Sequence, residues 1–418
     1  MRPSLPSTSQ CCACGACVDV CPRQALQFSE DENAFYCIIV KEESCNGCGL
    51  CEKRCHILHP EVLERHDACK VQPLAGWSLN QELIRKSASG GVFAQIAYHF
   101  LKSSQSSFVY GAALQPDDTV CHMEISHYCD LPVLQNSKYQ QSNATGCYKM
   151  VRKRLRQGAR VLFSGVPCHI AALYSFLQGT PLDNLYTIEV LCHGVPSNEL
   201  HRKALKFEHA SHIVSYRTKD DKGWIGNNNR LTYLHCNGKQ VTKKKHVYDF
   251  LFRAYLEFSF NRKNCFSCQY ATLNRVADIT LGDFWGWNLS ADHERYRNHM
   301  GTSILFPNSE KGKKLAYDCP DLYVTSASWE EILPYNQNLY MPTNDALFYG
   351  ANYIRRLRCM PSFVQKFVYQ NGFSNRYLNE IYRRCLNLLV WPRRRKQERE
   401  KQQGLQTALR TLNTGKKS

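Results

Sequence analysis

The sequence predicts an α+β module at the N-terminus, an α/β domain after it, and a helical, basic tail at the C-terminus. Two cysteine runs with the same spacing occupy residues 11–21 and 45–55, which indicates a small duplicated module. After residue 160, short apolar segments alternate with helical patterns, as in parallel sheets covered by helices. The formal net charge is +17, and residues 350–418 alone carry +13 of it.

The composition is that of a globular protein. Apolar residues make up 43% and charged residues 21% of the 418 positions, which excludes disordered and fibrous classes. Residues 1–349 carry only +4, and no aromatic stacking platform accompanies the basic tail, so we expect no nucleic-acid partner. No secretory signal or membrane-spanning run is visible. We therefore expect a cytoplasmic protein whose 22 cysteines serve metal binding or catalysis rather than disulfides.

The two cysteine runs have the spacing of ferredoxin iron–sulfur ligands. In each run three cysteines lie two residues apart and a fourth follows after three more, and in two-cluster ferredoxins this fourth cysteine ligates the other cluster. Structural zinc sites favour separated cysteine pairs instead. We predict two [4Fe–4S] clusters, the first held by Cys11, Cys14, Cys17 and Cys55, the second by Cys45, Cys48, Cys51 and Cys21.

Two cysteines near these runs, Cys12 and Cys37, do not fit the spacing, and we predict that they are not ligands. His56 stands where a proline usually follows the last cysteine of such a run. This departure affects the expected turn and leaves the ligands in place.

A glycine-rich segment precedes the first long helical pattern. Ser87-Ala-Ser-Gly-Gly91 leads into apolar residues at helical spacing from Val92 onward. Free backbone N–H groups at such a helix start favour an anion, such as a cofactor phosphate. A plain capped helix explains the same residues.

Four later cysteines are predicted to share a third site. Cys168 follows a short apolar strand at 161–164, and Cys192 follows another at 185–191. Parallel neighbouring strands would place both at one edge of the sheet, where open α/β sheets bind ligands. Cys265 and Cys268 form a C-x2-C pair that needs two more ligands. We predict a third [4Fe–4S] cluster at these four cysteines; zinc or unligated thiols are the alternatives.

Several short motifs follow one another along residues 75–305. They are Ser89-Gly-Gly91, Ser137-Lys-Tyr139, Val161-Leu-Phe-Ser-Gly-Val-Pro-Cys168, Cys192-His-Gly-Val-Pro-Ser197, Lys222-Gly-Trp224, Cys265-Phe-Ser-Cys268 and Asp278-Ile-Thr-Leu-Gly-Asp-Phe-Trp-Gly286. These motifs and their order resemble those of the beta subunits of coenzyme F-420 hydrogenases and dehydrogenases. The chain is most similar to bacterial members of this family that carry a fused ferredoxin and are often associated with surface-polysaccharide genes.

The resemblance implies an α+β ferredoxin module (residues 1–65) fused to an α/β flavin-binding domain in two parts (75–150 and 151–345), with a helical basic tail (346–418). It also implies an FAD beside the third cluster. The residues carried over as flavin contacts are Ser87, Ser89, Gly90, Gly91, Lys138, Tyr139 and Ser142. Val166, His169 and Asn136 differ from the residues usual in these motifs. These differences affect the hydrogen bonds expected on the flavin side and the expected substrate.

These features predict an iron–sulfur flavoprotein oxidoreductase that passes electrons between ferredoxin-type clusters and FAD to reduce or oxidise a small molecule. The alternative is a subunit that delivers electrons to a partner enzyme and has no substrate of its own. Either function needs a redox partner or a small-molecule electron donor. His193 adjoins Cys192 and is a candidate proton donor; a hydrogen bond to a ligand sulfur is its alternative role.

The C-terminal tail has two interpretations. Apolar residues from Tyr377 to Trp391 recur at helical spacing, and the basic run Arg393–Lys396 follows. A basic amphipathic helix of this kind is typical of contacts with a partner or with the inner face of the membrane. The alternative is a helix that packs on its own domain and is followed by a solvated, disordered tail.

Overall fold

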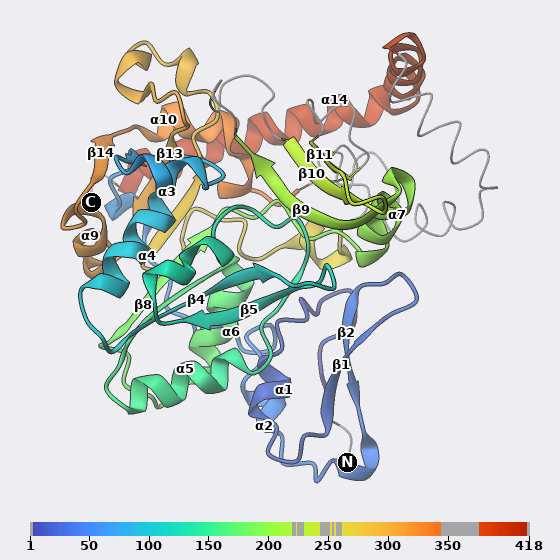
Figure 1. The fold of residues 1–418 in the computed structure, drawn as a ribbon, viewed down its shortest axis with the longest axis vertical. Coiled ribbons are helices and arrows are strands. Elements are labelled where there is room, and N and C mark those ends of the chain that lie inside the picture. Colours follow the sequence, from blue (N-terminus) through green and yellow to red (C-terminus); the bar gives the residue numbers. More distant parts are fainter. Residues whose placement is uncertain are drawn as a thin grey trace.

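The computed structural model describes residues 3–219, 223, 230–242, 251–252, 255, 261–343 and 376–415, with side chains of the last helix described from Lys396 onward. Figure 1 shows a small N-terminal module on one side of a large sheet and the last helix, α14, on the other. Three sheets organise these residues, with two, three and nine strands.

The N-terminal module is a hairpin with two short helices. Strands β1 (Leu26–Glu30) and β2 (Tyr36–Val40) pair antiparallel, and α1 (Ala16–Val20) and α2 (Leu50–Lys53) each start within a cysteine run. Both helices begin at a glycine in the left-handed region, Gly15 and Gly49. Such a backbone carries little strain only for glycine. The tight turn between the cysteines is therefore built into each run.

The large sheet has the order β14-β3-β13-β12-β8-β7-β4-β5-β6. Its centre is parallel, because β8 lies between β7 and β12 and β7 also pairs with β4, all in the same direction. Antiparallel pairings flank this centre. The strands are β3 (Leu74–Ser78), β4 (Ser107–Leu114), β5 (Val120–Ile125), β6 (Ser142–Asn143), β7 (Arg160–Gly165), β8 (Leu185–Val190), β12 (Ile279–Asp283), β13 (Ser303–Pro307) and β14 (Leu322–Ser326).

Helices cover both faces of this sheet. Because strand side chains alternate between faces, Val161 and Phe163 of β7 pack with α5 (Cys147–Arg156) and α6 (Pro167–Leu177), whereas Leu162 packs on the opposite face. That opposite face is covered by α4 (Val92–Lys102) and α9 (Glu310–Tyr317). Further short helices are α3 (Gln81–Arg85) and α10 (Trp329–Ile332).

A smaller layer of one helix and one sheet follows Cys192, a cysteine of the third predicted ligand set. Helix α7 (Asn198–Glu208) packs on an antiparallel sheet of β9 (Ala210–Thr218), β10 (Arg230–His235) and β11 (Gln240–Thr242). The Ser197 side chain caps α7 by accepting a hydrogen bond from the backbone of Glu199.

The N-terminal module is attached to the rest of the chain by specific polar contacts. The carboxylate of Asp19 in α1 accepts a 2.7 Å hydrogen bond from the backbone of Gly146, at the start of α5. Glu30 of β1 accepts hydrogen bonds from Asn198 and Arg202 of α7. The module is thus held between α5 and α7, beside the central parallel strands.

The local predictions of the middle region hold. The expected strands at 161–164 and 185–191 are β7 and β8, which are parallel neighbours, and the helix predicted from Val92 is α4. Helix α6 begins at Pro167, so that Cys168 lies in its first turn. Of the motif Lys222-Gly-Trp224, Lys222 and Trp224 lie outside the described residues.

The C-terminal segment is helical over Arg376–Gly415 as α14. Its end packs into the protein: Ala408 and Leu412 are buried in a cluster with Trp329 and Ala68. The alternative of a disordered tail is therefore wrong for residues 396–415. The apolar side chains predicted to form an amphipathic face, 377–391, lie outside the described side chains. Among the described residues, no helix is both long and apolar enough to span a membrane.

Candidate metal centres and the adjoining cavity

The second predicted ligand set lines one small cavity. The cavity has a volume of about 120 Å³ and lies against the loop before α2 and the end of α1. Burial raises the pKa of Cys51 to about 11, and the charge of Cys21 adds to this rise. The four cysteines that line this cavity are Cys21, Cys45, Cys48 and Cys51.

The first predicted ligand set lines a neighbouring cavity. Its four cysteines are Cys11, Cys14, Cys17 and Cys55, and the off-pattern Cys12 and Cys37 also line it. The guanidinium of Arg262, a buried residue near Cys265, reaches this cavity. It donates to the backbone oxygens of Cys11 and Tyr36 at 3.1 and 2.6 Å and so supports the loop that carries the first ligand.

The sulfurs of these two sets repel one another when they are charged. Burial raises the pKa of Cys11 to about 11, with further contributions from Cys12 and Cys55. Burial likewise raises the pKa of Cys17, and nearby Cys11, Cys55 and Cys51 add to the rise. A bound metal centre removes this repulsion because it deprotonates its thiol ligands outright. The donor sets therefore fit two cysteine-ligated clusters.

The third predicted ligand set comes from three segments that are distant in the sequence. Cys168 lies in the first turn of α6, Cys192 follows β8, and Cys265 and Cys268 lie in or just after a short 3-10 helix at Lys263–Ser267. All four line one cavity of about 670 Å³. Both Cys168 and Cys192 lie at the carboxyl edge of parallel strands, as predicted.

Gly194 lets two of these segments approach. Its φ is +100°, and a Cβ there would lie 2.3 Å from Nδ2 of Asn261 and 3.2 Å from Cβ of Cys265. A side chain at this position would push the Cys192 loop away from Cys265. Burial raises the pKa of Cys192 to about 11, with a further rise from the charge of Cys268. This set of four converging thiols also fits a cysteine-ligated cluster.

The start of α4 lines the same cavity. Ser87, Ser89 and Gly91 line it, together with the first residues of the helix. Its volume lies within the range of roughly 300–1,000 Å³ that is typical of small-molecule sites. A helix start beside a cavity of this size fits a phosphate-bearing organic cofactor.

The serine side chains that precede α4 form hydrogen bonds within the protein. The Ser87 hydroxyl donates to the backbone oxygen of Leu83, and that of Ser89 donates to the backbone oxygen of Thr302. A Cβ on Gly90 would lie 2.5 Å from the backbone oxygen of Gly76. Gly90 is therefore required by close packing, and the contribution left for a cofactor phosphate is the backbone of the first turn of α4.

Lys138, Tyr139 and Ser142 also line the cavity. The Lys138 ammonium donates to three backbone oxygens of its own loop, the shortest at 2.7 Å to Gln135, and burial lowers its pKa to about 7. The Tyr139 ring packs against Tyr255 at 4.5 Å between centroids. The three residues thus shape the wall opposite α4.

Two histidines of the site occupy different positions. His193 lines the cavity next to Cys192, and burial lowers its pKa while Asp283 opposes this change. His169 lies against the His122 ring at 5.0 Å, and burial lowers its pKa to about 4. His122 in turn contacts the Ser142 hydroxyl at 2.7 Å. A buried histidine pair therefore connects Cys168 with the wall at Ser142.

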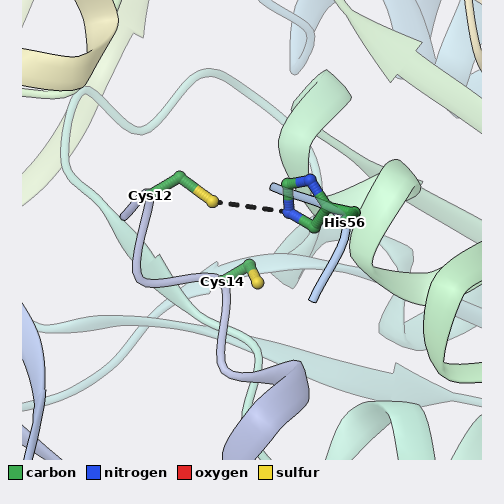
Figure 2. A group of neighbouring side chains, drawn as sticks. All are labelled: Cys12, Cys14 and His56. Carbon is green, nitrogen blue, oxygen red and sulfur yellow. Dashed lines mark hydrogen bonds between the residues drawn. The ribbon is translucent and has the colours of Figure 1, made fainter. Parts of the chain in front are cut away.

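Sequence reasoning missed the polar residues that join the first and third cysteine sets. Cys12 and His56 lie in contact, 3.5 Å from Sγ to Nε2, and Cys14 is adjacent to both (Figure 2). His56 also contacts the hydroxyl of Tyr270. The available signal was that Cys12 and His56 both depart from the ferredoxin pattern.

Comparisons with known proteins match the two parts of this arrangement separately. Residues 158–325 match the family described as the C terminus of the coenzyme F420 hydrogenase/dehydrogenase beta subunit, and residues 6–27 match the 4Fe-4S binding domain. The predicted resemblance to this family is therefore confirmed over residues 158–325, and a match to a ferredoxin-type 4Fe-4S domain lies in front of them.

Individual relatives match shorter parts of the chain. An uncharacterized ferredoxin of Methanocaldococcus jannaschii is 41% identical over 46 residues, which is 11% of this chain and 58% of the relative. The ketoisovalerate oxidoreductase subunit VorC of Methanothermobacter marburgensis is 38% identical over 55 residues, 13% of this chain and 65% of the relative. The matches thus span somewhat less than two thirds of each relative.

Among solved structures, a chain of the F420-reducing [NiFe] hydrogenase complex from Methanosarcina barkeri is similar. The TM-score is 0.41 at 16% sequence identity, and the match covers 66% of this chain and 86% of the other.

Proposed function

We propose that this protein is an iron–sulfur flavoprotein oxidoreductase that passes electrons between ferredoxin-type [4Fe–4S] clusters and FAD, and thereby reduces or oxidises a small molecule. The observation that carries the proposal is the convergence of Cys168, Cys192, Cys265 and Cys268 on the cavity that also receives the start of α4. A third cluster at these cysteines would lie directly beside the proposed flavin.

The three cysteine sets are neighbours in the right order for such a pathway. The charge of Cys51, from the second set, acts on Cys17 of the first set. Cys12 lies beside Cys14 of the first set and Cys168 of the third. A flavin exchanges two electrons with a substrate and single electrons with clusters. The chain's own residues supply the ligands, the close spacing and the exclusion of water.

The rest of the cavity supports a flavin between the α4 side and the Tyr139 side. The backbone N–H groups of the first turn of α4 would bind the diphosphate. The wall at Lys138 and Tyr139 would hold the remainder of the cofactor. His193 borders both the cysteines and the cavity, and we propose that it moves a proton at the substrate.

Anaerobic purification with separate iron and flavin determination tests the proposal. We expect one FAD and about twelve irons per chain. Cys265→Ser should lower the iron content to about eight, whereas Cys121→Ser, a half-buried cysteine outside the cavities, should leave it unchanged. About eight irons in the wild type, or no flavin, would refute the respective part of the proposal.

The second candidate is an electron-delivery subunit without its own substrate. The observation that favours it is that one relative of the ferredoxin part is itself named as a subunit of an oxidoreductase. A screen of NADH, NADPH and reduced ferredoxin for flavin bleaching and turnover separates the two functions. Bleaching without turnover until a partner enzyme is added would favour delivery.

A further inference from the structure

The outward side of helix α5 is basic along its whole length. Its cations recur at the i, i+3, i+4, i+7 spacing that places side chains on one face of a helix. They are Lys149, Arg152, Lys153 and Arg156, of which Arg152 is half-buried and the others are exposed. The opposite side of the helix, with Tyr148 and Val151, is buried in the protein. The helix therefore turns four positive charges toward the solvent.

The N-terminal module adds a fifth cation beside this helix. Arg54, which follows α2, donates to the side chain of Gln178 and to its backbone oxygen, the latter at 3.4 Å. Arg152 lies on the ring of Phe176 in the same end of α6, 4.4 Å from the ring centre. Figure 1 shows α5 next to α1 and α2 at the lower edge of the molecule, and α1 is hydrogen-bonded to the start of α5. Together the five side chains form one basic face.

The charges of the basic face repel one another. Burial lowers the pKa of Arg152, and the charges of Arg156 and Arg54 lower it further. The charge of Asp19 opposes this shift, but its carboxylate accepts hydrogen bonds from the backbone at the start of α5. Within the described part of the chain, none of the five cations forms an ion pair with a carboxylate. A negatively charged partner would relieve this repulsion.

The basic face borders the first predicted cluster. Arg54 directly precedes Cys55, a ligand of the first set, and lines the cavity of that set. Helix α1, which carries the ligand Cys17, is bonded to the start of α5. Two apolar side chains of these segments are exposed, Met150 of α5 at 38% and Leu58 at 40%. Apolar side chains bordered by arginines are typical of protein–protein interfaces.

We propose that the basic face docks a small acidic electron-carrier protein, of the kind of a soluble ferredoxin, which exchanges single electrons with the first cluster. The inference rests on the clusters of the proposed function and assigns the surface through which they are loaded or discharged. In each encounter the carrier loses or gains one electron and the cluster gains or loses the same electron. Complexes of this kind are transient and use small interfaces, which one helix and an adjoining helix end can supply.

Opposite charge makes such encounters fast. Electrostatic steering raises association rates by roughly 10–10³-fold, and this gain falls steeply with ionic strength. A nucleic acid or an anionic membrane would also be attracted to cations, but neither has a use for a cluster beside them. The position of the basic face next to the Cys55 loop therefore favours an electron carrier.

The test is stopped-flow spectroscopy on the full-length protein purified anaerobically. Electron exchange with an acidic plant-type [2Fe–2S] ferredoxin is measured at several ionic strengths, in the direction that proceeds. Lys153→Glu/Arg156→Glu reverses two exposed charges of the basic face, and Lys153→Gln/Arg156→Gln, a milder change, keeps the test decisive if the first variant loses iron. Lys313→Glu/Lys314→Glu is the matched control, because it makes the same change of charge on α9, which covers the opposite face of the large sheet.

We expect the wild-type rate to fall with added salt. At low salt the charge-reversal variant should be slower by about tenfold or more. The neutralised variant should lie between this variant and the wild type, and the α9 control should stay near the wild type. Iron content should be unchanged in all of them, and reduction by the methyl viologen radical, a small cation, should not be slowed.

Three results would overturn the inference. Equal slowing in the basic-face variant and the α9 control would mean that only the net charge matters. Unchanged ferredoxin rates in both basic-face variants would exclude the docking surface. If these variants instead lose binding to duplex DNA or to phosphatidylcholine vesicles that contain phosphatidylserine, the basic face has another anionic partner. A wild type without iron would refute the clusters of the proposed function, and that result is read before any variant is made.

Discussion

Arg275 holds the C-x2-C segment against β8, and its removal gives a sharp prediction. Its guanidinium pairs with Glu189 of β8, and the exposed fractions are 4% and 0%. It also donates to the backbone oxygens of Tyr270 and Thr272, at 2.8 and 2.9 Å, in the loop that follows Cys268. The strand and the loop each carry part of the third cysteine set.

Arg275→Met should leave the Glu189 carboxylate buried without its cation, while the Thr280 hydroxyl still donates to it at 2.8 Å. Breaking a buried ion pair from one side costs about 3–5 kcal/mol, a large part of the roughly 5–15 kcal/mol that stabilises a folded domain. The double variant Glu189→Met/Arg275→Met removes both charges and should recover most of this loss.

The assay is anaerobic urea unfolding, in which a shift of the midpoint at constant slope gives the free-energy difference. The control is Arg202→Met, because Arg202 pairs with Glu30 while 54% exposed and should contribute only about 0–1 kcal/mol. A loss in Arg275→Met no larger than that of the control, or no recovery in the double variant, would refute the reasoning.

Three further predictions concern the scaffold. Burial lowers the pKa of His201 from 6.5 to about 4. Between these two pH values the unfolded chain binds a proton that the folded chain does not, so the free energy of unfolding falls as the pH drops. His201→Phe should therefore make the thermal midpoint less dependent on pH between about pH 6.5 and 5. Gly90→Ala should destabilise by about 1–3 kcal/mol in urea unfolding, since its Cβ meets the backbone of β3. Leu412→Ala should cost about 2–5 kcal/mol by the same measurement, because Leu412 is 2% exposed.

The spacing of residues along the chain predicted the division of the cysteines into sets and the position of the parallel strands. The cysteine runs could be divided into two sets because the x2, x2, x3 spacing leaves few geometries, and each set lines its own cavity. The strand–turn–helix pattern around Cys168 predicted a parallel edge, which β7 and β8 form. These features depend on residues close together in the sequence.

Other features depend on contacts between distant segments, and no local pattern carries them. The glycine-rich loop fitted a phosphate site or a plain helix start, and only the approach of Gly76 shows that Gly90 is required by packing. Cys12 and His56 are 44 positions apart, and their contact also involves Tyr270, more than 200 positions further along the chain. The antiparallel flanks of the large sheet likewise include strands widely separated in sequence.

The basic C-terminal segment acquires a structural role that its charge did not suggest. Leu405, Ala408, Leu409 and Leu412 of α14 pack into the cluster around Trp329, and the thiol of Cys69 contacts the backbone of Thr411 at 3.6 Å. These apolar side chains are used within the fold, so they are not the face that would enter a membrane surface. Lys396 remains 78% exposed. Any contact of this part of the helix with a partner would therefore use its charged side, while its apolar side secures the domain that carries the cavity.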